Sequence, residues 1–165
     1  MSGFRTRRAA PGRAGKQEIW LVDADGSNPT RLTRGPGRFQ GTPGWSPDGR
    51  SIAFDSYAED GHSDIWTIGV DGSGLRQITS DPADDCVPIW SRDGRFVLFV
   101  SDRRAEPWFG VEDSNLYAVS PDLEAPTDGE ALRAVSEFRG LVVAYAEGPD
   151  GRVAMIGTLP PEEPR

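Results

Sequence analysis

The sequence is poor in the residues on which most catalytic and covalent chemistry depends. Among 165 residues there is one histidine, His62, and one cysteine, Cys86. A single cysteine excludes an internal disulfide, and a single histidine excludes a histidine pair and a histidine-rich metal site. The serine-hydrolase motif G-x-S-x-G is also absent. The sequence therefore predicts no catalytic residue, no metal ligand and no cofactor.

Long apolar runs are absent as well. No stretch approaches the roughly 18 apolar residues of a membrane span, so no membrane-spanning segment is expected. Thr6-Arg7-Arg8 is similar to the start of a twin-arginine export signal, but residues 9–16 lack the apolar stretch that such a signal needs. We therefore expect no intact secretion signal, and the sequence leaves the compartment undefined.

Acidic residues outnumber basic ones, and the formal net charge is −8. Residues 1–16 carry five basic side chains and no acidic one, whereas the remainder has 13 basic and 26 acidic side chains. Because an acidic body repels phosphates, nucleic acid is not an expected partner. Composition predicts a disordered basic tail over 1–16 and a second tail over 160–165, with the folded domain at 17–159.

The sequence is rich in turn-forming residues and contains two tryptophan-centred motifs that each occur twice. The chain has 20 glycines and 14 prolines, which suits frequent turns. GWSPDGR at 44–50 returns as IWSRDGR at 89–95, and EIWLVDADGS at 18–27 returns as DIWTIGVDGS at 64–73. A period of about 45 residues with several short strands per unit indicates a β-propeller, with one blade per period.

Each period divides into four strand-sized segments. In the most regular copy the expected strands are 42–46, 50–56, 64–70 and 75–79. In the next copy they are 87–91, 95–101, 115–120 and 129–136. Residues 17–33 match the last two strands of a blade, and 141–157 match the first two. The predicted fold is all-β, with blades of four antiparallel strands, three blades in total and one blade split between the ends of the chain.

Four tryptophans occupy repeat positions: Trp20, Trp45, Trp66 and Trp90. Inner strands of stacked blades are buried on both faces, and large rings fill the wedge between neighbouring blades. We therefore expect these tryptophans to be packing residues.

The repeat resembles that of the TolB-like β-propellers, whose wording is close to P-x-W-S-P-D-G-[RK]-x-I-A-F. Residues 43–54 match this wording almost without gaps, and the resemblance extends well over 18–102 and loosely over 115–156. It implies a periplasmic or surface interaction scaffold, or the gating domain that stands before a serine peptidase.

The loops divide between two faces of the expected disc. The turns between strands one and two and between strands three and four form the tight-turn face. The connections at 34–41, 57–63, 80–86, 102–114 and 137–140 vary in length and form the irregular loop face. Binding sites usually lie in variable loops on a common scaffold. Trp108 and Phe109 lie outside the repeat and beside arginines, a composition typical of interface hot spots. The candidate binding residues are Arg38, Phe39, Asp84, Asp85, Arg103, Arg104, Trp108 and Phe109.

We expect a non-enzymatic scaffold that binds a protein or peptide through the irregular loop face. Two chains that complete each other's split blade would close a six-bladed homodimer. One alternative is a fragment of a longer TolB-like propeller, or of a propeller-gated serine peptidase, with no activity of its own. Another is a hydrolase, acting through His62 or through a metal.

Overall fold

The computed structural model describes residues 16–58, 61–103, 114–121, 132–134, 141–147 and 152–158. Residues 1–15 of the tail predicted at 1–16 lie outside these residues, as does the tail predicted at 160–165. Three candidate binding residues also lie outside: Arg104, Trp108 and Phe109. In the described part of the chain, no helix has the length and apolarity that a membrane crossing requires.

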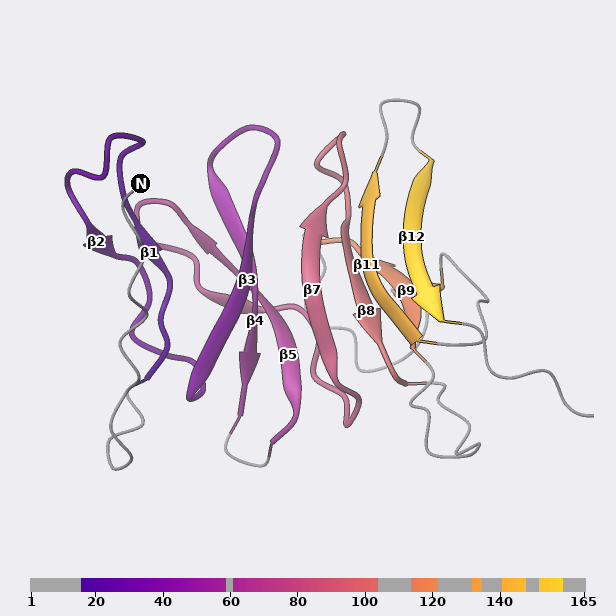
Figure 1. Cartoon of the computed structure of the whole chain (residues 1–165). Helices are drawn as coiled ribbons and strands as arrows, with labels where there is room; N and C mark the ends of the chain where they lie inside the picture. Colours follow the sequence, from indigo (N-terminus) through magenta and orange to yellow (C-terminus); the bar gives the residue numbers. More distant parts are fainter. Residues whose placement is uncertain are drawn as a thin grey trace, which may run out of the picture.

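The described residues form antiparallel sheets that stand side by side in a row (Figure 1). The N-terminal strand pair contains β1 (Trp20–Leu21) and β2 (Thr30–Arg31). The first four-stranded sheet contains β3 (Phe39–Trp45), β4 (Ser51–Tyr57), β5 (Ser63–Gly69) and β6 (Arg76–Gln77). The second contains β7 (Asp85–Trp90), β8 (Val97–Ser101), β9 (Asn115–Val119) and β10 (Leu132–Ala134). The C-terminal strand pair contains β11 (Leu141–Glu147) and β12 (Val153–Thr158). The all-β fold and its division into two, four, four and two strands are confirmed.

The tight turns between the first two strands of the two four-stranded sheets are held by a repeated serine. The Ser46 hydroxyl donates to Asp48 at 2.6 Å and accepts the backbone N–H of Ser51 at 2.9 Å. Ser91 makes the equivalent bond to Asp93 at 2.7 Å. The serine hydroxyl is the main cause of a lowered pKa at each aspartate. The Ser-x-Asp-Gly wording of the repeat therefore encodes a hydrogen-bonded turn.

The core lies between adjacent sheets, because side chains alternate between the two faces of each strand. Phe54 and Ile52 pack with Ile19 of the N-terminal strand pair. Ala53, on the opposite face of β4, packs with Phe99 of the second four-stranded sheet. Strands β4 and β8 are buried almost throughout, as expected for inner strands covered on both faces.

The four repeat tryptophans, expected to pack between blades, differ in how far they are covered. Trp66 and Trp90 are half-buried and pack against the cores between sheets. Trp20 and Trp45 are 55% and 57% exposed. The repeat sequence is the same, so the difference arises from what lies next to each tryptophan.

Two strand boundaries differ from the prediction because of a β-bulge. Strand β3 begins at Phe39 rather than Thr42, and β7 begins at Asp85 rather than Val87. In both strands the register shifts where the chain passes the bulge, and φ is +38° at Thr42 and +56° at Val87. Positive φ is rare for β-branched residues, so a sequence pattern does not predict a bulge at these positions. The strand pairing that precedes each bulge was therefore not predicted.

The buried carboxylate of Asp55 joins the two bulges. It accepts a hydrogen bond from the Thr42 hydroxyl of its own sheet. It also accepts the backbone N–H of Val87, in the neighbouring sheet, at 3.0 Å. Asp55 therefore satisfies a donor that the bulge removes from the strand ladder, and it links the two sheets.

Replacing Asp55 by alanine is expected to lower the free energy of unfolding by about 1–3 kcal/mol, because the Val87 N–H loses its acceptor. Urea unfolding followed by circular dichroism measures the change. Asp71→Ala, in an exposed turn, is the matched control and should have a smaller effect. Equal losses in the two variants would contradict a special role for Asp55.

Candidate functional site

Two exposed aromatic rings lie side by side at the irregular-loop end of the first four-stranded sheet. Phe39 and Tyr57 are direct partners across β3 and β4, and they are 36% and 39% exposed. The Arg38 guanidinium lies 5.7 Å from the centre of the Phe39 ring. The backbone N–H of Arg38 donates to the Tyr57 carbonyl at 2.9 Å, which fixes the backbone of Arg38 against β4.

Polar side chains continue this surface beyond the rings. His62 Nδ1 lies 3.7 Å from Asp84 Oδ1, and both side chains are half-exposed. Asp84 Oδ1 also accepts the backbone N–H of Ser63 at 3.0 Å, which orients the carboxylate. Arg38, Phe39, Tyr57, His62 and Asp84 are called the aromatic patch below.

Tyr57 contributes a neutral phenol to the aromatic patch. Burial, followed by the negative charges of neighbouring acidic groups, raises the pKa of Tyr57 above its ordinary value. The hydroxyl therefore keeps its proton at neutral pH and remains a hydrogen-bond donor.

Two of the candidate residues lie inside the scaffold instead of on its surface. Asp85 is fully buried, and both of its carboxylate oxygens lie 2.7 Å from one guanidinium nitrogen of Arg103. A second nitrogen of Arg103 lies 2.8 Å from Asp81. The guanidinium also lies over the Tyr117 and Phe99 rings, 4.8 and 5.5 Å from their centres. Burial raises the pKa of Asp85, and Arg103 opposes that shift.

Three of the predicted binding residues, Arg38, Phe39 and Asp84, therefore come together in one patch. Sequence reasoning did not select Tyr57 or His62 for binding. A signal for Tyr57 was available, because it stands where the next repeat has Asp102, and an aromatic residue at that position is not a repeat requirement.

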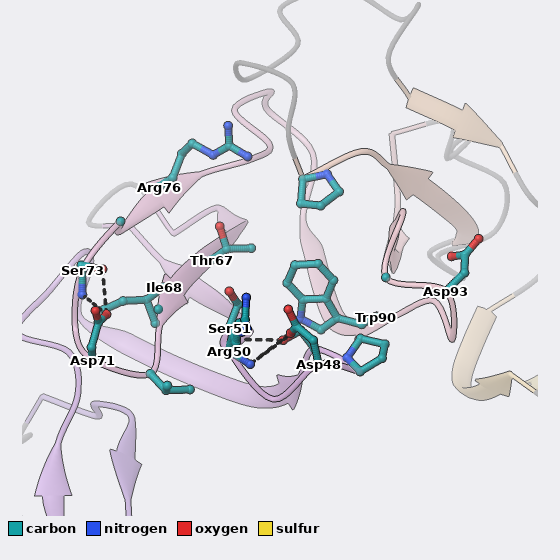
Figure 2. A pocket seen from close by; sticks show the side chains of 17 residues that line it. Asp48, Arg50, Ser51, Thr67, Ile68, Asp71, Ser73, Arg76, Trp90 and Asp93 are labelled. Atoms are coloured by element: carbon teal, nitrogen blue, oxygen red, sulfur yellow. Dashed lines mark hydrogen bonds between the residues drawn. The ribbon is translucent and has the colours of Figure 1, made fainter.

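A hollow lies on the tight-turn face, between the two four-stranded sheets. It has a volume of about 860 Å³ and is lined by turns of both sheets. Figure 2 shows the Trp90 ring in this hollow beside Asp48 and Arg50. Asp71 on its rim accepts the backbone N–H and the hydroxyl of Ser73 at 2.9 and 2.7 Å. The rim carboxylates are thus engaged in their own turns, and the hollow is a junction into which Trp90 packs.

Ser63 and Cys86 are two groups of nucleophilic type among the described residues. Ser63, which follows His62 in the chain, is fully buried, so its hydroxyl does not reach the surface. Burial raises the pKa of Cys86 to about 12, which keeps the thiol protonated. Within the described ranges, no three histidine, cysteine, aspartate or glutamate side chains gather in a way that would hold a metal ion.

Four-stranded antiparallel sheets that pack face to face in a row define a β-propeller. The chain belongs to the family of the tricorn protease N-terminal beta propeller domain, whose model matches residues 14–149.

Curated relatives and solved structures support the TolB-like repeat. The chain is 43% identical over 78 residues to the Tol-Pal system protein TolB of Anaeromyxobacter dehalogenans, a match that covers 47% of this chain and 17% of that protein. It is 32% identical over 80 residues to the uncharacterised peptidase YuxL of Bacillus subtilis, covering 48% of this chain and 12% of YuxL. The structure of a TolB-type protein from Agrobacterium tumefaciens superposes with a TM-score of 0.70 at 22% identity, covering 87% of this chain and 47% of that one. The matches thus span less than a fifth of the two curated relatives.

Arg103→Ala is expected to lower the free energy of unfolding by about 3–5 kcal/mol at neutral pH, because it leaves the buried Asp85 carboxylate unpaired. Arg103→Lys keeps the charge but loses the forked contact and the ring stacking, so an intermediate loss is expected. Urea unfolding of the two variants and the wild type measures both effects.

The deficit of Arg103→Ala should shrink as the pH falls. A carboxyl whose pKa is raised in the folded state contributes stability below its ordinary pKa of 3.8, and this contribution is lost as the pH rises through the folded pKa. Without Arg103 the upward shift loses its largest opposing cause, so the deficit should be larger at pH 7 than near pH 4. A deficit that does not change with pH would show that Asp85 is not the group responsible.

Proposed function

We propose that the chain is a non-enzymatic scaffold that binds a protein or peptide through the aromatic patch on the irregular loop face. The observation that carries the proposal is the Phe39–Tyr57 pair, two rings that stay exposed beside Arg38 on a rigid sheet. Aromatic residues and arginine dominate the energetics of protein interfaces, because they bury large areas at a small entropic cost.

The surroundings of the two rings fit a peptide ligand. Arg38, His62 and Asp84 provide donors and acceptors around an apolar centre, which is the usual anatomy of an interface. The patch stands on β3 and β4, whose register holds the two rings opposite each other before a partner arrives. A preorganised surface of this kind loses little conformational entropy on binding. The similarity to TolB proteins, which are named for the Tol-Pal system, supports a role in protein assembly.

The absence of enzymatic activity is part of the proposal. A hydrolase acting through His62 requires a nucleophile beside the imidazole, and the neighbouring Ser63 hydroxyl is buried. Asp84 lies 3.7 Å from His62 but also accepts the backbone N–H of Ser63, so it holds the loop that carries His62.

We further propose that two copies assemble into one closed ring of six blades. One copy provides two four-stranded sheets and two strand pairs, and each strand pair is half of a blade. The exposed rings of Trp20 and Trp45 support this assembly, because both are packing positions of the repeat.

A second candidate function is that of a gating segment in a larger peptidase. The match to the tricorn protease propeller family and the similarity to the peptidase YuxL favour it. In that case the strand pairs would be completed by further blades of the same polypeptide.

Peptide selection tests the binding proposal. Peptides selected from a random phage library on the wild-type protein should bind the Phe39→Ala/Tyr57→Ala double variant at least about tenfold more weakly, as measured by fluorescence anisotropy. Leu75→Ala, which removes an exposed apolar side chain next to a tight turn, is the control and should bind like the wild type. Equal affinity in all three proteins would refute the assignment of the aromatic patch.

Light scattering tests the assembly. A mass of twice the 17.9 kDa of one chain is expected for folded protein. A folded monomer would refute the six-bladed dimer and leave the gating segment as the better candidate.

A further inference from the structure

We infer that the outer edge of β1, together with the exposed Trp45, is a docking site for the C-terminal strand pair of a second copy. The inference rests on the proposed assembly and adds the hairpin that docks, its register and the residues it covers.

In the repeat alignment β1 corresponds to β5, the third strand of the first four-stranded sheet. In the first four-stranded sheet β5 pairs with β4 on one side and β6 on the other, and β9 is placed likewise in the second. Among the described strands β1 pairs with β2 alone, and β12 pairs with β11 alone. Figure 1 shows the two strand pairs at opposite ends of the row, so they do not meet within one chain.

The exposed side chains of Trp20 and Val22 show that no described residues cover the outer face of the N-terminal strand pair. Ile68 is 3% exposed, because it packs against Ile19 of the adjacent strand pair. Val22 occupies the same repeat position and is 57% exposed. Trp20 and Trp66 differ in the same way. An isoleucine or valine at this position is therefore covered wherever a neighbouring sheet is present.

The exposed Trp45 shows which part of the neighbouring blade is missing. Its repeat equivalent, Trp90, packs at the hollow formed by the Pro47–Asp48 turn of the preceding sheet. The Cβ of an alanine at Gly94 would lie 3.8 Å from Pro47, which shows how closely that turn approaches the next sheet. The element that precedes Trp45 is the N-terminal strand pair, which has no such turn.

The segment between β11 and β12 has the sequence of the required turn. Residues 149–152 read PDGR, the same four residues as 47–50, and they connect β11 to β12. A second copy that adds β11 and β12 beside β1 would place this turn against Trp45, as the Pro47 turn is placed against Trp90. Within the chain this is the hairpin whose sequence matches the missing one.

The two four-stranded sheets define the register. Ile52 pairs with Ile68 and Phe54 with Trp66 in the first, and the equivalent residues pair identically in the second. Repeat alignment transfers this register to the pairs Ala154–Val22, Met155–Leu21 and Ile156–Trp20 between copies.

Disulfide trapping tests the register. In a Cys86→Ser background, Leu21→Cys combined with Met155→Cys should give a covalent dimer on oxidation, visible on a non-reducing gel. Leu21→Cys with Ala154→Cys is the control, because Ala154 is one position out of register and faces the other side of the sheet. Its covalent dimer should be at least about tenfold less abundant. Equal trapping of both pairs, or trapping of the control alone, would overturn the inference.

The contact with Trp45 has its own test. Trp45→Ala should raise the dimer dissociation constant at least about tenfold in analytical ultracentrifugation, whereas Leu75→Ala should leave it unchanged. A dimeric wild type with no in-register disulfide and no effect of Trp45→Ala would refute this docking mode while leaving the assembly intact. A monomeric wild type would refute both, and neither result bears on peptide binding at the aromatic patch.

Discussion

The fold depends on one constraint: every sheet has two apolar faces, and each must be covered by a neighbour. Strands β4 and β8 are buried almost throughout, so neither sheet is amphipathic in the manner of a sandwich sheet with one wet face. Burial of apolar surface contributes about 25 cal/mol per Å², which makes the junctions between sheets the main source of stability. The positions of the tryptophans, the tight turns and the uncovered ends all follow from this requirement.

The β-bulges at Thr42 and Val87 interrupt the hydrogen bonding between strands. Asp55 compensates at the junction of the two four-stranded sheets by accepting the backbone N–H of Val87. The Asp85–Arg103 ion pair is a second buried polar contact, within the second sheet. Buried charges that are satisfied on every side rigidify such a junction. The same rigid sheet ends display the aromatic patch.

The phase of the repeat was sufficient to predict the strands and the way they divide into sheets, because turn residues and apolar runs act locally. The burial of the tryptophans could not be predicted from the local sequence, since equivalent motifs give a half-buried Trp90 and an exposed Trp45. Burial is set by the neighbouring sheet, which a motif does not encode. Arg38, Phe39 and Asp84 were selected from variable loops and lie together. Asp85 and Arg103 were selected from the same loops but form a buried ion pair, which depends on the register of β7 and β8.

The Asp85–Arg103 pair also makes one repeat of the chain chemically different from the other. In the first four-stranded sheet the equivalent positions are Gln40 and Ala58, and Gln40 instead donates to the Pro36 carbonyl at 2.7 Å. Apolar cores built from near-identical repeats discriminate poorly between correct and exchanged neighbours, and misassembly is a characteristic failure of repeat proteins. Asp85 and Arg103 both belong to the second four-stranded sheet, in β7 and just after β8, so a wrong partner strand for β7 would leave the buried carboxylate without its arginine. This chemical difference between the two repeats therefore favours the correct strand pairing as the chain folds.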